Sequence, residues 1–231
     1  MCIRDSVKIL SILFLPYALL KLDGGDRVKY AVAFAAVALA PILIMPSAFV
    51  DMMRFQMSWS LENSWYIYIF PDAATPLTLL EEPPLGVKAA KILGYALMLL
   101  LYIHVLGLEL PPERFMAFAS ATYLLTTPRY SPQTSILLLP FLPFVMTPAM
   151  IPGFLLWETA NASIILTWFT TDVPHLPWQP PQIASLIRSL ALLVMFIQME
   201  VAVRGFGIRI SGMRIEQGLR KVREVVSRLV G

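Results

Sequence analysis

The chain has 231 residues and a net charge of +3; 58% of the residues are hydrophobic and 14% are charged, against about 25% charged in a soluble globular domain. A soluble fold of this size cannot bury so much apolar surface, so the composition excludes a soluble domain and predicts an integral membrane protein. One cysteine and two histidines exclude an internal disulfide and argue against a zinc or other histidine metal centre.

The first six residues, 1–6, do not have the pattern of a cleavable signal, and an apolar run follows them at once. They resemble a translated sequencing-adapter remnant, of the kind found at the ends of environmental gene fragments. We therefore expect a non-native leader here and a natural protein that extends further upstream. An unusual true amino terminus is the alternative.

Seven segments are apolar over nearly enough residues to cross a bilayer, whose ~30 Å hydrocarbon layer needs about 20 helical residues. In chain order they are 7–22, 28–50, 85–108, 113–127, 132–146, 153–171 and 183–203. The sequence predicts an all-α, polytopic membrane protein of about seven transmembrane helices, with 7–205 as one transmembrane domain. The fourth segment is short, so we expect it to be tilted or covered by its neighbours. Prolines inside these runs predict kinks: Pro16, Pro41, Pro46, Pro140 and Pro143.

The distribution of charge predicts the orientation. Seven Lys or Arg residues lie between Arg204 and Arg228, and such an excess marks the cytoplasmic side. Seven crossings then place three connections on the opposite, non-cytoplasmic face: 51–84, 128–131 and 172–182. The sequence therefore indicates a multi-pass protein of the cell membrane with a cytoplasmic carboxy-terminal tail.

The tail, residues 206–231, combines apolar residues near helical spacing with a basic opposite side. This pattern predicts an amphipathic helix on the anionic inner leaflet. A topology anchor is the simpler interpretation, and docking of another protein is the alternative. The basic tail accounts for much of the positive charge, so the charge is no argument for nucleic acid as a partner.

The first predicted outer connection contains a polar and aromatic stretch, 54–66. Its charged and amide groups suit a sugar or a phosphate at a membrane surface, because aromatic faces stack on sugar rings and an arginine binds phosphate through two donors. The candidate binding residues are Arg54, Glu62, Asn63 and Ser64. An interfacial aromatic belt, with Trp and Tyr at headgroup level, is the alternative.

A second polar stretch, 126–133, lies on the same predicted face. Pro132 suits the first turn of a helix, and polar groups at a helix amino terminus favour anions such as phosphate. The candidates are Arg129, Tyr130, Ser131 and Gln133. A plain turn with a snorkelling arginine is the alternative.

These stretches carry a resemblance to a known family. The run 129–133 with 137–140 resembles the SPQ-to-LLP segment of GT-C glycosyltransferases, particularly the polyprenyl-phosphate-mannose-dependent mannosyltransferases of the GPI mannosyltransferase and DUF2029 branches. Residues 8–16 are similar to the family's Lys-plus-LP helix, and 61–65 to a luminal glutamate motif. The passages keep the family's order over about 8–168. Two departures concern donor preference: Thr134 replaces the usual aromatic residue, and Arg129 lies unusually close to Ser131.

The resemblance implies a hexosyltransferase that moves a sugar, mannose by analogy, from a polyprenyl-phosphate donor to a glycan or lipid acceptor, without a cofactor or metal. It also implies a catalytic carboxylate in an outer loop upstream of Met1, so Glu62 is only a weak candidate for the general base. The eight candidates above would then bind the donor. A transporter or flippase of lipid-linked glycans and a structural membrane subunit are the alternatives.

Ionisable residues within predicted helices are costly and often functional. Glu158, with Asn161 on the same face, is expected to be either a paired or protonated structural carboxylate or part of the active site. Glu200 is expected to pair with Arg204 four residues on.

Overall fold

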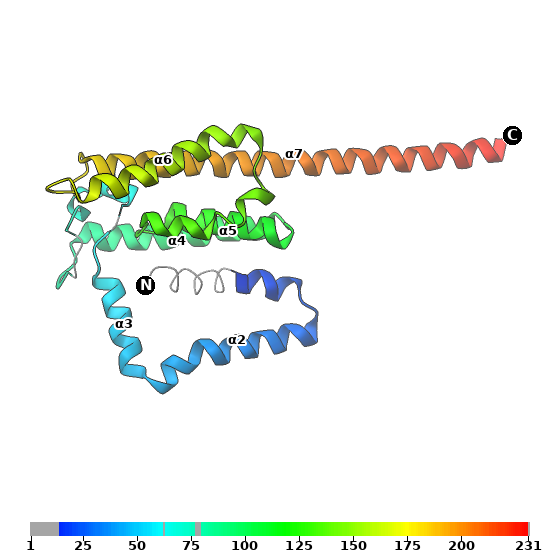
Figure 1. Ribbon diagram of the computed structural model, residues 1–231. Coiled ribbons are helices and arrows are strands. Elements are labelled where there is room, and N and C mark those ends of the chain that lie inside the picture. The colour runs from blue at the N-terminus through cyan, green and yellow to red at the C-terminus, as the bar shows by residue number, and fades with distance from the viewer. Residues whose placement is uncertain (1–13, 62, 77–79, 231) are drawn as a thin grey trace.

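The structure, a computed structural model, describes residues 14–61, 63–76 and 80–230, with side chains described as far as Gly205 apart from five positions in the first two long helices. This part of the chain is helical, with short 3-10 turns and no strand. Figure 1 shows a helical bundle, flanked on one side by an arm formed of α2 (Gly24–Ile44) and α3 (Pro46–Ser58).

The arm differs from the single helix predicted over 28–50. The structure has two helices there, α2 (Gly24–Ile44) and α3 (Pro46–Ser58). The break falls at Met45, whose φ of −136° and ψ of 68° are not helical. The proline that follows explains this break, because its ring disfavours helical geometry in the residue before it and its nitrogen donates no hydrogen bond. Residues 7–13 of segment 7–22 lie outside the described residues, and residues 14–21 are helical.

The bundle contains α4 (Leu85–Gly107), α5 (Pro112–Thr126), α6 (Ile151–Trp168) and α7 (Pro180–Val230). The helices α4 and α5 pack as one antiparallel pair, and α6 and α7 as another. Each of these four helices begins within a few residues of its predicted start.

The short helix α5 forms the centre of the core, as its length suggested. Eleven of its 15 residues are buried, among them Phe115 and Phe118 with no exposed surface. Phe118 makes an edge-to-face contact with Phe196 on α7, at 5.4 Å between ring centroids. A glycine lets α4 and α5 approach each other closely: a Cβ on Gly94 of α4 would lie 2.7 Å from the carbonyl oxygen of Thr126 on α5. The α4–α5 crossing therefore requires glycine at position 94.

The predicted helix over 132–146 is wrong. The segment forms two short 3-10 turns, Pro132–Leu137 and Leu142–Phe144, and a third, Pro148–Met150, leads into α6. Pro140 and Pro143 each remove a backbone donor and clash with the preceding turn of an α-helix. Leu137, Leu138 and Leu142 of this segment are buried in the core. Their packing on α5 and α6 therefore holds the segment in place without a continuous set of helical hydrogen bonds.

Three described segments are long and apolar enough to cross a membrane: Leu85–Gly107, Pro148–Trp168 and Pro180–Gly205. Their outer faces are apolar, with Leu99, Leu166 and Val201 all exposed. Such surface belongs in a lipid bilayer. The last span continues without a break, since the backbone of α7 is helical as far as Val230 and extends well beyond the bundle (Figure 1).

Candidate functional site

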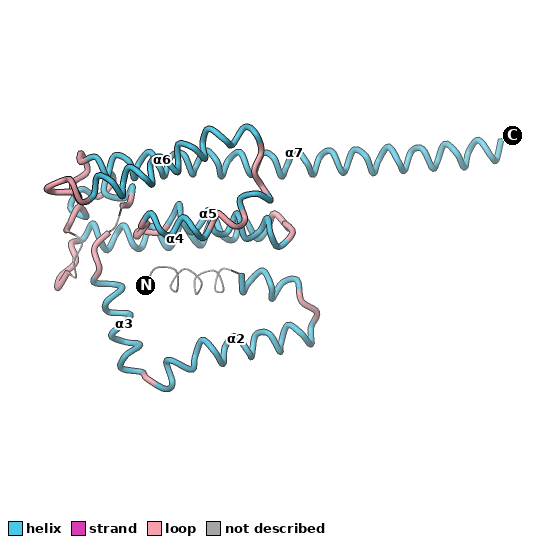
Figure 2. The backbone as a smooth tube through the Cα atoms, viewed as in Figure 1, coloured by secondary structure: helices cyan, strands magenta, loops and turns pink. Residues whose placement is uncertain are grey.

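The two polar stretches singled out in the sequence meet at one end of the bundle. The Trp65 indole N–H donates to the carbonyl of Leu125 (2.9 Å), and the Tyr66 hydroxyl donates to that of Thr126 (2.8 Å). The connection between α6 and α7 joins them there, because the Tyr68 hydroxyl donates to the carbonyl of Pro177 (2.8 Å). Figure 2 shows these loops gathered at the end of the bundle where α7 begins.

The residue that joins the two stretches is Arg188 on α7. Its side chain is fully buried. One guanidinium nitrogen, Nη2, donates to the carbonyls of both Asn63 and Tyr130, each at 2.8 Å. Nη1 donates to Oδ1 of Asn161 on α6 at 3.2 Å. A single buried cation therefore ties both loops and α6 to α7.

The partners of Arg188 extend the network into the core. The amide nitrogen of Asn161 donates to Oγ of Ser135 (2.9 Å). The indole N–H of Trp157 donates to the hydroxyl of Tyr130 (2.9 Å), whose ring lies under the Arg188 guanidinium at 3.5 Å. Buried polar groups linked in this way fix side-chain positions, since an unmade bond in such a place is costly.

Two further cations lie at this end, around Trp59. The Arg129 guanidinium is 5.1 Å from the centre of the Trp59 ring. The Lys91 ammonium, on α4, donates to the Trp59 carbonyl at 2.7 Å and is only 3% exposed as a residue. The Trp59 carbonyl and ring thus each contact a basic side chain, and two positive charges near one residue favour an anion nearby.

The predicted residues are not all brought together. Asn63, Ser64 and Tyr130 are buried in the network, while Arg129 is half-buried beside it. Arg54 points away on α3, where its side chain is 79% exposed and lies 4.0 Å from Asp51.

The remaining candidates lie at the surface or outside the described chain. Ser131 is half-buried, and its carbonyl accepts a bond from the Thr134 hydroxyl at 2.6 Å. Gln133 is exposed. Glu62 lies outside the described residues.

Asn63 adopts an unusual backbone conformation that serves the network. Its φ of 46° is left-handed, a region in which asparagine is several-fold enriched among non-glycine residues. This turn directs its carbonyl to Arg188. Its side-chain Oδ1 is buried and has no hydrogen-bond partner among the described groups.

The tyrosine hydroxyls of these loops are hydrogen-bonding groups and not bases: those of Tyr66 and Tyr68 donate, and that of Tyr130 accepts from Trp157. Burial raises the pKa of Tyr66 and that of Tyr68. Burial also raises the pKa of Tyr130, although the Arg188 charge opposes it. All three hydroxyls remain protonated at neutral pH and donate or accept hydrogen bonds in place.

Arg188 and Lys91 were not among the site residues predicted from the sequence. Both are charged residues inside predicted spanning segments, which is the signal that did draw attention to Glu158 and Glu200. Each lies within about two turns of its helix end, a position where a snorkelling side chain is the usual interpretation. The folded chain turns both inward instead.

The expected pair at the opposite end is confirmed. Glu200 accepts a hydrogen bond from Arg204 and also lies 3.1 Å from His104 on α4. These contacts link α4 to α7. Among the described residues, no group of three or more His, Cys, Asp or Glu side chains forms a metal site.

Comparisons with protein-family models, with curated proteins and with solved structures found no match to this chain. The class that the fold and composition define is an all-helical membrane protein with a buried, cationic cluster of loops at one end of its bundle.

Proposed function

We propose that this chain is the donor-binding part of a GT-C-type glycosyltransferase. It would bind a polyprenyl-phosphate sugar, mannose by the resemblance, and present it to a glycan or lipid acceptor at the non-cytoplasmic face. The observation that carries the proposal is that the stretches around Asn63 and Tyr130, which resemble two separate motifs of that family, are bonded to the same arginine, Arg188.

The chemistry of the cluster suits such a donor. A polyprenyl-phosphate sugar has a phosphodiester charge, a sugar ring and an apolar chain. Arg129 and Lys91 supply positive charge next to Trp59, and charge in a partly desolvated place attracts phosphate more strongly than charge in water. The Trp59 ring is a stacking surface for the sugar, and the apolar outer faces of α4 and α6 accommodate the lipid chain.

The proposal assigns roles by position. Arg129 binds the phosphate, and Ser131 and Gln133 contact the donor from the surface of the same turn. Arg188 holds the loops and does not itself reach the donor, because it is fully buried. Arg54 is outside this cluster on its exposed arm. No general base is assigned among the described residues.

The orientation is part of the proposal. Seven crossings with a cytoplasmic tail would place the Trp59 and Tyr130 regions together on the outer face. Single cysteines at Glu81, next to the Leu80 that bonds to the Ser58 carbonyl, and at Gln133, both exposed, would react with a membrane-impermeant maleimide from outside only, in a chain whose Cys2 is replaced. Labelling of the two positions from opposite sides would exclude the proposed site.

The decisive experiment measures donor binding by the full chain in lipid nanodiscs. Radiolabelled polyprenyl-phosphate mannose is expected to bind saturably, and Arg129→Ala to weaken binding about tenfold or more, as loss of one charge-assisted phosphate contact does. Arg27→Ala removes an exposed charge of α2, outside the cluster; it is the matched control and should bind as the unchanged chain does.

Two results would count against the proposal. Equal loss in both variants would mean that overall charge, and not this cluster, attracts the donor. Binding of polyprenyl phosphate and its mannosyl form with equal affinity would remove the sugar from the recognised ligand and favour a carrier of lipid phosphates.

A further inference from the structure

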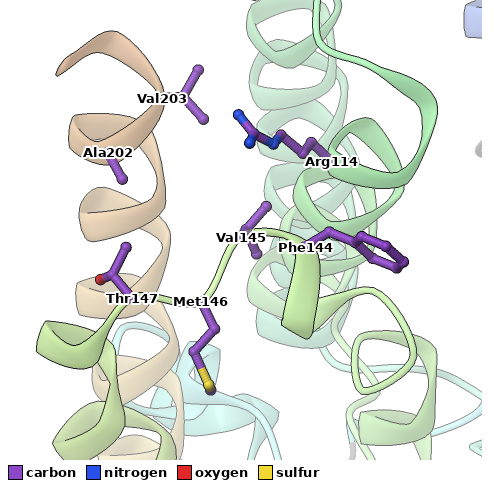
Figure 3. Close-up of a pocket in the computed structure, with 7 residues that line it drawn as sticks. All are labelled: Arg114, Phe144, Val145, Met146, Thr147, Ala202 and Val203. Carbon is purple, nitrogen blue, oxygen red and sulfur yellow. The ribbon is translucent and has the colours of Figure 1, made fainter. Parts of the chain in front are cut away.

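A small pocket lies at the end of the bundle opposite the loop cluster. It has a volume of ≈ 180 Å³, and it is open to the outside. Its walls come from the first turn of α5, from the chain between the last two 3-10 turns and from α7 (Figure 3): Arg114, Phe144, Val145, Met146, Thr147, Ala202 and Val203.

The pocket combines one cation with apolar walls. Figure 3 shows the Arg114 side chain reaching from α5 across the opening toward Val203 on α7, with Val145 beneath it. Val145 is buried, whereas Phe144 is 52% exposed at the rim. The Thr147 hydroxyl is the other side-chain polar group in the lining. Such a site fits a ligand with an anionic group attached to an apolar body.

The position of the pocket along α7 corresponds to the level of a membrane surface. Val203 lies in the last turn of the apolar span Pro180–Gly205. It is about 23 residues from the start of that span, or ~34 Å along the helix axis at 1.5 Å per residue, which exceeds the ~30 Å of hydrocarbon. When Pro180 lies near one surface, the pocket is at the level of the opposite headgroups.

The charge around the pocket favours an anion. Arg204 follows Val203 and is exposed, with its guanidinium bonded to Glu200. Glu113 in the same turn as Arg114 has the opposite sign. Beyond Gly205 the sequence adds six more Lys or Arg residues against two Glu, so this end of the chain is positive overall, and a basic site between helices near a membrane surface is the setting in which anionic lipid headgroups bind.

We propose that this pocket binds an anionic membrane phospholipid, with the headgroup phosphate on the Arg114 guanidinium and the Thr147 hydroxyl. The lipid's acyl chains would lie along the exposed apolar faces of α6 and α7. The occupant is a bilayer lipid and not free phosphate, because the walls are apolar and the length of the span puts the pocket at headgroup level. This site is independent of the donor proposal.

The test is native mass spectrometry of the full chain released from micelles that contain phosphatidylglycerol and phosphatidylcholine in equal amounts. The unchanged chain should retain one phosphatidylglycerol in preference to phosphatidylcholine. Arg114→Ala should reduce that preference at least fivefold. Arg220→Ala removes one charge from the tail and is the matched control, with the preference unchanged.

A second variant separates the pocket from its charge. Ala202→Phe keeps every charge and fills the space between α5 and α7, so it should also abolish preferential retention. Size-exclusion profiles like that of the unchanged chain show that both variants are folded.

Three outcomes would overturn the proposal: equal retention of the two lipids by the unchanged chain, retention by Arg114→Ala and Ala202→Phe at the original level, or displacement of the lipid by millimolar inorganic phosphate. A loss in Arg220→Ala equal to that in Arg114→Ala would equally refute it, because the tail would then be the attracting group.

Discussion

The guanidinium carbon of Arg188 lies 3.5 Å from the centre of the Tyr130 ring, with the same side chain bonded to the Tyr130 carbonyl. Arg188 therefore contacts Tyr130 through both the ring and the backbone carbonyl of the tyrosine. The contact joins the start of α7 to the turn after α5, and Asn63 is attached to the same cation.

Replacing Arg188 should destabilise the fold. Arg188→Met removes the donor to two buried carbonyls, which then remain unsatisfied, and we expect a loss of about 2–4 kcal/mol in the free energy of unfolding. Unfolding by denaturant in mixed micelles measures it. Arg54→Met is the control: with a side chain 79% exposed, it should change the free energy by less than about 0.5 kcal/mol. Equal effects would show that the network adds no stability.

The α4–α5 crossing should not tolerate a methyl group. Gly94→Ala would place a Cβ 2.7 Å from the Thr126 carbonyl oxygen and 3.0 Å from the Tyr66 hydroxyl. We expect a loss of about 1–3 kcal/mol from this overpacking, although alanine favours a helix. A Cβ at Gly107 would have no neighbour within 4 Å, so Gly107→Ala should be neutral or slightly stabilising when both variants are unfolded by denaturant in mixed micelles.

The two left-handed residues should show opposite effects on stability when Asn63 is replaced by alanine and Glu109 by glycine. Asn63→Ala is expected to cost about 1 kcal/mol, because alanine adopts a left-handed backbone, here with a φ of 46°, less readily than asparagine does. Glu109 has a φ of 49° on an exposed turn, and Glu109→Gly should raise the thermal midpoint. A lower midpoint for Glu109→Gly would contradict this explanation.

Alkaline pH should weaken the loop cluster. Burial raises the pKa of Tyr66 in the folded chain, so above the ordinary value near 10 the unfolded state loses its proton first. Stability is then complete below about pH 10 and falls by about 1.4 kcal/mol per pH unit above it for this group.

Denaturant unfolding at pH 8 to 11 measures that slope. Tyr66→Phe should be less stable than the unchanged chain at pH 8, since the bond to the Thr126 carbonyl is lost, yet should show a shallower decline above pH 10. A parallel decline would mean that Tyr66 is not the titrating group.

Much of the helical scaffold was predictable, because long apolar runs specify helices locally. The start of α4 was placed at its observed residue, Leu85, and that of α5 within one residue of Pro112. Segment 132–146 was misjudged because hydropathy counts Pro140 and Pro143 as small interruptions, whereas each removes a helical bond. The meeting of the Asn63 and Tyr130 stretches was expected from the alternation of sides along the chain. That Arg188 joins the two stretches could not be predicted, since nothing local in the sequence distinguishes an arginine that points into the bundle from one that snorkels to the membrane surface.

The helix α7 gives the molecule one mechanical consequence. Arg188 and Val203 are 15 residues apart on an unbroken helix, a separation of about 22 Å. An α-helix changes little in length, so an axial slide that displaces the backbone at Val203 also displaces the backbone at Arg188. A movement of α7 at the pocket is therefore transmitted to the loop cluster at the other end of the bundle.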